Sequence, residues 1–124
     1  MNSKKKGNVG IGAAIAYFTK LGCTVSIPLT DSQEYDLIVD MDGVLKKVQV
    51  KTTSQRKGDG PYRVQLRTCG GNQSFHTVKH FNGGLVDLMF ILTASGERYL
   101  MPTNDKSPKS NMVLGEKYRE FRVS

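Results

Sequence analysis

The clearest hydrophobic pattern along the chain predicts a β-hairpin in the first half. Residues 37–39 are apolar and rich in β-branched side chains, which favours an extended strand. Residues 44–51 then alternate, with valines on one face and lysines and a glutamine on the other. Between the two runs stands Asp42-Gly43, a pair that tolerates the positive φ angles of a two-residue turn. The pattern therefore predicts two antiparallel strands joined by a tight turn.

Other segments predict the elements around this hairpin. Residues 7–21 combine good helix formers with an apolar face, with Asn8 as the expected N-cap and Gly22 as the end. Residues 85–93 contain the most apolar run and predict a central strand buried on both faces. Further predictions are strands at 23–27, 61–67 and 98–101, a glycine-rich turn at 69–73, a helical turn at 74–81, a polar loop at 104–111 and a short amphipathic helix at 113–123.

This order of elements predicts a small α/β or α+β domain. We expect a mixed central β-sheet, with the first helix packed on one face. The 124 residues suffice for one domain with its own core, and no internal repeat or linker suggests a second. We therefore treat residues 1–124 as a single domain.

The charge balance indicates the class of partner. The formal net charge is +7, which favours binding to a polyanion or an anionic membrane. The apolar runs are too short to span a bilayer, and no apolar signal-peptide core follows the basic start, so a cytoplasmic location is expected. Cys23 and Cys69 lack a CxxC partner and are expected to be reduced and structural.

Candidate chemistry gathers on the two arms of the predicted hairpin. Asp36 and the side-chain carbonyl of Gln49 can ligate a hard divalent cation through oxygen, together with the main-chain carbonyl of Val50. Lys51 can orient a nucleophilic water and stabilise charge building on phosphorus. Taken singly, Asp36 is more simply a turn cap and Lys51 a solvated strand residue. All four together favour metal-assisted phosphodiester cleavage.

These residues resemble the signature of the PD-(D/E)XK nucleases. Asp36 is followed by Gln49-Val50-Lys51, with Gln49 in place of the usual acid. The context is similar to that of small bacterial homing endonucleases encoded in group I introns, and the resemblance extends from Lys6 to Pro102. The resemblance rests on two segments, Tyr35-Asp36-Leu37-Ile38-Val39-Asp40 and Val48-Gln49-Val50-Lys51-Thr52-Thr53.

The resemblance implies a restriction-endonuclease-like core, in which helices flank the mixed central sheet. It also implies double-stranded DNA as substrate and Mg²⁺ or another divalent metal as cofactor. Asp36, Gln49 and Lys51 would be the catalytic residues, and Asp36, Gln49 and Val50 the metal ligands. A homo-oligomer, dimer or tetramer, is implied because such small chains must pair to cut both strands.

One position departs from the family pattern. The relatives place a Gly-Glu pair near the start of the first helix, where the glutamate adds a carboxylate to the metal site. Here Ile11 follows Gly10, and no Asp or Glu occurs in residues 1–30 that could substitute. The resemblance therefore implies either a site that works with fewer acidic ligands or an impaired nuclease.

Basic and amide side chains near the motif are candidate DNA contacts. Residues 4–6 read as a basic arm, either a solubilising tail or a phosphate contact. The polar face of residues 61–67 is either solvated or suited to reading base edges in the major groove. The predicted DNA-binding residues are Lys5, Lys6, Arg56, Lys57, Arg63, Gln65, Arg67 and Lys79.

Three functions remain open on these grounds. The first is a site-specific, Mg²⁺-dependent homing endonuclease, and the second is a catalytically inactive DNA-binding relative of the same fold. The third is a structural or RNA-binding protein in which the motif is coincidental. A zinc site is not favoured, because His76 and His80 have helical spacing without an HExxH pattern or a third ligand.

Overall fold

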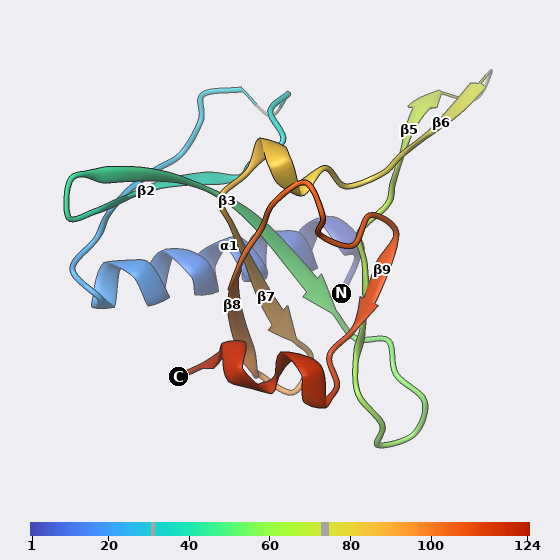
Figure 1. The fold of residues 1–124 in the computed structure, drawn as a ribbon. Helices are drawn as coiled ribbons and strands as arrows, with labels where there is room; N and C mark the ends of the chain where they lie inside the picture. The colour runs from blue at the N-terminus through green and yellow to red at the C-terminus, as the bar shows by residue number, and fades with distance from the viewer. Residues whose placement is uncertain (31, 73–74) are drawn as a thin grey trace.

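A computed structural model describes residues 1–30, 32–72 and 75–124, which form a mixed β-sheet with α1 on one face (Figure 1). In these residues the main sheet has six strands in the order β1-β2-β3-β7-β8-β10. The strands are β1 (Thr24–Ser26), β2 (Leu37–Met41), β3 (Val44–Thr53), β7 (Leu88–Thr93), β8 (Arg98–Pro102) and β10 (Arg122–Val123).

The β2–β3 hairpin forms as the sequence predicts. Its strands are antiparallel, and Leu37 lies opposite Val48. Asp42 and Gly43 take φ angles of 54° and 87°, the left-handed region that this turn requires. Asp40 Oδ1 accepts a hydrogen bond from the Gly43 N–H at 2.8 Å, which closes the turn from inside the hairpin.

The apolar strand β7 lies at the centre, also as predicted. It runs parallel to β3, and Val50 is paired with Phe90. Phe90 is fully buried on one face, and its neighbours Met89 and Ile91 are buried on the other. A strand buried on both faces is apolar throughout, which explains the unbroken run in the sequence.

Helix α1 (Ser3–Lys20) covers one face of the sheet and begins earlier than predicted. Its N-cap is Asn2, whose side chain accepts a hydrogen bond from the Lys5 N–H, so the predicted cap at Asn8 is wrong. The three lysines at 4–6 are therefore helical and do not form an extended arm. The helix lies so close to β3 that a Cβ on Gly10 would collide with Thr52, which explains a glycine in mid-helix.

Two apolar clusters lie on opposite faces of the sheet. The helix-side cluster is built from Ala14, Phe18, Leu37, Val39, Val48, Val50 and Phe90. The far-side cluster is built from Tyr62, Val64, Leu66, Phe81, Val86, Met89, Ile91, Tyr99, Met101, Met112 and Leu114.

The far face is covered mainly by strands and short 3₁₀ turns. Strand β4 (Arg63–Gln65) pairs with β9 (Asn111–Val113), and its residues alternate between buried and exposed as predicted. The 3₁₀ helices are η1 (Gly83–Leu85) and η2 (Glu116–Phe121). The predicted amphipathic helix at 113–123 is wrong, since η2 is a short 3₁₀ segment between β9 and β10, on the far side from α1 (Figure 1).

A two-stranded ribbon extends away from the sheet. It consists of β5 (Thr68–Asn72) and β6 (Phe75–Lys79), which are antiparallel (Figure 1). The predicted glycine-rich turn at 69–73 and helical turn at 74–81 are wrong over the described residues, and residues 73 and 74 lie outside them. Pairing with β5 favours an extended chain at β6, and the spacing of the histidines does not reveal this partner strand. No helix in the described parts of the chain is long and apolar enough to cross a membrane.

Candidate active site

The hairpin register places Asp36 against the middle of β3. The Asp36 N–H donates to the Val48 carbonyl at 2.8 Å, which continues the strand pairing by one residue. Its carboxylate oxygen Oδ2 accepts from the Val50 N–H at 2.8 Å. Asp36 is thus held at both its backbone and its side chain, so its carboxylate has a fixed place beside Gln49 and Lys51.

Gln49 and Lys51 lie on the face of β3 that points away from α1. Val48 and Val50 belong to the helix-side cluster, so the residues that alternate with them face the other side. Both side chains are half-buried. The Gln49 amide Nε2 donates to the Val50 carbonyl at 3.4 Å, so the Gln49 side chain lies beside that carbonyl.

Burial perturbs both charged groups of the motif. It raises the pKa of the Asp36 carboxyl above its usual range, against the opposing effects of the Val50 N–H and the Lys51 charge. Burial likewise lowers the pKa of the Lys51 ammonium, against the opposing charges of Asp36 and Glu34. A carboxylate and an amine that are both partly desolvated, on adjacent strands, are typical of a reactive site.

The donor set fits a hard cation, with a single carboxylate in the motif. Asp36, Gln49 and the Val50 carbonyl supply oxygen, which Mg²⁺ and similar ions prefer. Within the described residues, no group of three or more His, Cys, Asp or Glu side chains lies close enough to hold an ion. Ile11 packs against the helix-side cluster and is part of the apolar contact between α1 and the sheet.

Sequence reasoning missed one acid near the site. Glu34 lies two residues before Asp36, and its charge acts on the Lys51 ammonium. Its carboxylate also forms an ion pair with Lys79 at the end of β6. No sequence spacing pointed to this acid, because its ion-pair partner lies more than 40 residues further along the chain.

The comparisons with known proteins agree with this geometry. The family model described as PD-(D/E)XK endonuclease matches residues 1–122. The chain belongs to this family. The resemblance inferred from the motif is therefore confirmed, and the protein is a nuclease domain of the PD-(D/E)XK type, a class that acts on DNA and generally uses divalent metals.

Two relatives match the PD-(D/E)XK chain along nearly its whole length. Protein 5.3 of Escherichia phage T7 is 29% identical over 127 residues, covering 99% of this chain and 100% of the phage protein. The solved structure of a bacterial homing endonuclease, I-Ssp6803I, matches with a TM-score of 0.79 and 28% identity. It covers 100% of this chain and 85% of the homing endonuclease. The predicted restriction-endonuclease-like fold class is thereby confirmed.

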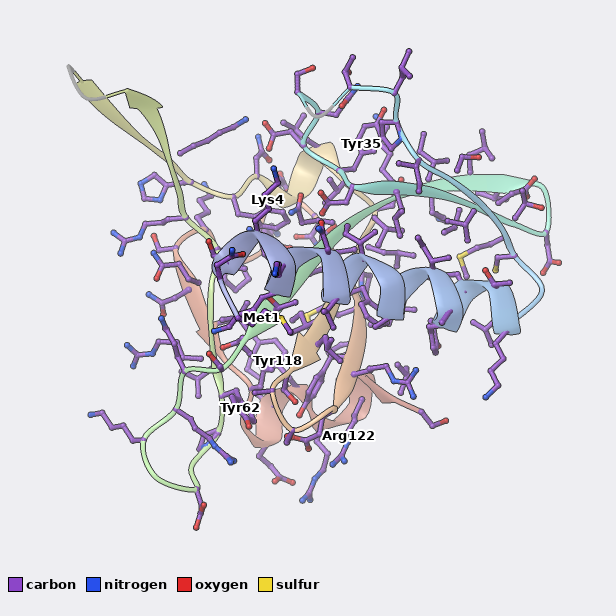
Figure 2. All side chains as sticks on the ribbon, turned by 180° about the vertical axis from the view of Figure 1, so that it is seen from behind. Met1, Lys4, Tyr35, Tyr62, Tyr118 and Arg122 are labelled. Atoms are coloured by element: carbon purple, nitrogen blue, oxygen red, sulfur yellow. The ribbon has the colours of Figure 1, made fainter. Side chains whose placement is uncertain are left out.

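The residues predicted to bind DNA are spread over several elements of this nuclease domain. Lys6, Arg63 and Gln65 line a groove of about 610 Å³ between the start of α1 and the ends of β3 and β7. Lys6 Nζ also donates to Ser54 Oγ at 3.4 Å across this groove. Lys5 is exposed on the opening turns of α1, where Figure 2 labels the neighbouring Lys4.

The remaining DNA-contact candidates are not among the residues that line the groove. Arg56 stacks over the Tyr62 ring at 4.5 Å, where the loop after β3 rejoins the body (Figure 2). Lys57 and Arg67 are exposed, and Lys79 is exposed apart from its ion pair with Glu34. Their contact with DNA stays a prediction.

Of the two histidines, the structure describes the side chain of His80 alone. His80 Nδ1 lies 3.2 Å from Ser110 Oγ, so its ring has a hydroxyl partner. His76 is in β6, and its side chain lies outside the described residues.

Proposed function

We propose that the chain is a site-specific double-stranded DNA endonuclease of the homing type, with Mg²⁺ as the preferred cofactor. One observation carries this proposal: the Asp36 carboxylate is hydrogen-bonded to the Val50 N–H, beside the half-buried Gln49 and Lys51. The homing-endonuclease neighbour with a TM-score of 0.79 supports the same class. Residues 1–124 would act as one nuclease domain, and a cytoplasmic location stays a prediction.

Each residue of the motif has a distinct role in this proposal. Asp36, Gln49 and the Val50 carbonyl would hold the cation. The bound cation would neutralise charge on the scissile phosphate. Lys51 would orient the attacking water and offset the negative charge that develops on phosphorus. Because Lys51 is partly desolvated, its interaction with the phosphate is stronger than that of a solvated lysine.

A homo-oligomer is part of the proposal. A chain with one motif cuts one strand at a time, so a second copy is needed to cut both strands together. Mass measurement of the purified protein with duplex DNA, by light scattering, tests this. We expect two or four copies per duplex, and a single copy on DNA that is cleaved on both strands would contradict it.

The basic residues would bind DNA in two ways. Arg63→Ala and Arg67→Ala should each weaken binding to the target by about 1–3 kcal/mol if they contact base edges bidentately, with smaller losses on a scrambled duplex. Lys5→Ala should weaken both duplexes alike and flatten the salt dependence, as expected for a phosphate contact. Titrations of both duplexes at several salt concentrations give the comparison. Equal losses on both duplexes for the arginine variants would contradict base reading.

A second candidate is a relative that binds DNA but does not cut it. It is favoured by Ile11, which stands where the family carries a glutamate and packs instead among apolar side chains. A cleavage assay with Mg²⁺, with binding measured alongside, separates the two candidates.

A glutamate introduced at position 11 should show how far the absence of the helix carboxylate limits cleavage. Ile11→Glu is expected to raise the single-turnover rate about tenfold or more without improving DNA binding, because it restores the carboxylate that the family resemblance assigns to this helix position. It is also expected to cost stability, since the carboxylate replaces a packed side chain. The matched control is Ile15→Glu, which lies one turn further along α1 against the same cluster. Equal rates for Ile11→Glu and the parent would show that this helix position has no catalytic role here.

A further inference from the structure

The polar face of β3 carries a further cation, Lys47, that the nuclease motif does not include. Lys47, Gln49 and Lys51 alternate along the strand with buried valines, so their side chains lie on the face of the sheet away from α1. Lys47 is exposed, whereas the other two side chains are half-buried. Lys47 is therefore at the open end of the row of polar side chains that leads into the candidate site.

An aromatic ring holds the Lys47 side chain. The Lys47 ammonium lies 5.5 Å from the centroid of the Tyr35 ring, which is a cation–π contact. Tyr35 is half-buried, packs against the far-side cluster and immediately precedes Asp36, where the loop enters β2 (Figure 2). The ring is thus anchored by the core of the domain and stands next to the carboxylate of the motif.

The backbone of Lys47 is fixed from the other side of β3. Its N–H donates to Asp87 Oδ2 at 2.9 Å, and its carbonyl accepts from the Asp87 N–H at 2.9 Å. Asp87 precedes β7 and Tyr35 precedes β2, and these two strands flank β3 on opposite sides. Among the side chains that the structure describes, no carboxylate forms an ion pair with the Lys47 ammonium. The charge is therefore oriented by an aromatic ring and is available to an anion.

We propose that Lys47 binds a DNA phosphate near the one at Lys51, and that Tyr35 is the positioning residue that orients it. The proposal rests on the DNA binding in the proposed function and deepens it, and it holds whether or not the chain cuts. Lys47 and Lys51 are separated along β3 by about 13 Å, at about 3.3 Å per residue. A DNA strand rises about 3.4 Å per nucleotide. With one phosphate at Lys51, another within about four nucleotides can therefore reach Lys47.

The cost of ordering a lysine explains why the ring matters. An exposed lysine has many rotamers and loses part of this freedom when it binds a phosphate. A ring that already holds the ammonium over the polar face lowers this entropy cost before DNA arrives. The ammonium has three N–H donors, so it can contact the ring and still donate to a phosphate oxygen.

The test measures binding of the full chain to a random-sequence DNA duplex, without Mg²⁺ and over a series of salt concentrations. Lys47→Ala should raise the Kd about two- to fivefold, as expected for the loss of one exposed charge pair. It should also make the slope of log K against log salt shallower by about 0.9, the value for one phosphate contact. Lys47→Arg should retain both values, since a guanidinium stacks on aromatic rings and binds phosphate.

The matched control is Lys46→Ala. Lys46 is the neighbouring residue on β3 and faces the helix side of the sheet, so its removal takes away an equal charge from the other face. It should leave both the Kd and the salt slope near the parental values. Because Lys47 is exposed, its variants should fold, and thermal melts check this.

Two substitutions test the role of Tyr35. Tyr35→Phe keeps the ring face and should retain the parental salt slope, whereas Tyr35→Leu removes the ring and should raise the Kd by no more than Lys47→Ala does. In a chain that already carries Lys47→Ala, Tyr35→Leu should add no further loss, because its effect acts through Lys47. Binding is measured well below the melting temperature of each variant, since the ring also packs against the far-side cluster.

The outcomes separate this proposal from the proposed function. An unchanged Kd and slope in Lys47→Ala would overturn the phosphate contact, and so would equal losses in Lys47→Ala and Lys46→Ala. If Tyr35→Leu bound DNA like the parent, or added its full loss to that of Lys47→Ala, the positioning role would be overturned. In each of these cases the parent still binds DNA, so the nuclease function stands. Absence of duplex binding by the parent would overturn the proposed function itself.

Discussion

Replacing Lys51 with alanine is expected to lower the single-turnover cleavage rate by about two to three orders of magnitude, with little change in DNA affinity. The ammonium lies on the polar face of β3 beside Gln49, and its partial burial makes it an effective partner for charge on phosphorus. The lost interaction would be stronger in the transition state than in the bound substrate. The rate should therefore fall while binding is retained.

The control for Lys51→Ala is Lys46→Ala, on the same strand but on the opposite face. Lys46→Ala should cleave at nearly the parental rate, because it removes an equal charge without touching the motif. Rates measured at saturating enzyme and Mg²⁺ provide the comparison. Cleavage by Lys51→Ala at the parental rate would show that the active site has been assigned to the wrong residues.

Asp36→Asn is expected to reduce cleavage about 100-fold or more and to weaken divalent-cation binding in parallel. A bound metal contributes several kcal/mol to transition-state stabilisation, and about 1.4 kcal/mol corresponds to a factor of ten in rate. Asparagine keeps the size of the side chain and an oxygen that can accept from the Val50 N–H. The substitution therefore isolates the loss of negative charge.

The stability of Asp36→Asn gives a second measurement. Burial raises the pKa of Asp36 in the folded state, so the ionised carboxylate costs folding free energy as pH rises through the interval between its ordinary and its raised value. The cost is fully present at pH values above the raised pKa, where the carboxyl is ionised in both the folded and the unfolded state. Above that pH, Asp36→Asn should thus melt no lower than the parent, and the difference in melting temperature should narrow at pH values below the ordinary pKa of the carboxyl.

The control for this substitution is Asp42→Asn at the hairpin turn. Asp42 is exposed and has a positive φ, a conformation that asparagine also adopts readily. It should change neither cleavage nor cation binding. If Asp36→Asn also cleaved at the parental rate, the Asp36 carboxylate would not be a ligand of a cation that cleavage needs. Its hydrogen bond to the Val50 N–H would then have a structural role only.

The elements that the sequence predicted well are those determined by neighbouring residues. The Asp42-Gly43 turn and the alternation of β3 identified the hairpin, and with it the Asp36 to Lys51 motif. The unbroken apolar run of β7 predicted a central strand. These features depend on backbone conformation and side-chain period, which local sequence records directly.

Predictions failed where a distant partner decides the conformation. The sequence predicts the start of α1 at residue 7, but the Asn2 cap begins the helix at Ser3, and the close approach to Thr52 accounts for Gly10 within it. β6 was read as a helical turn because its pairing with β5 is not visible in its own residues. The C-terminal segment was read as a helix, although contacts with β8 and the far-side cluster hold it in 3₁₀ and extended form.

The sequence by itself determined the hairpin, its motif, the basic character of the domain and the absence of an acid in the first helix. Only the tertiary structure decided which partners the charged groups in and beside the motif have. It holds the Asp36 carboxylate on the Val50 N–H, and it brings Glu34 to Lys79 at the foot of a ribbon far along the chain. The physical reason is that charges and hydrogen bonds act over a few ångströms in space. Sequence spacing therefore identifies such partners only where a local element, such as the hairpin, sets the distance between them.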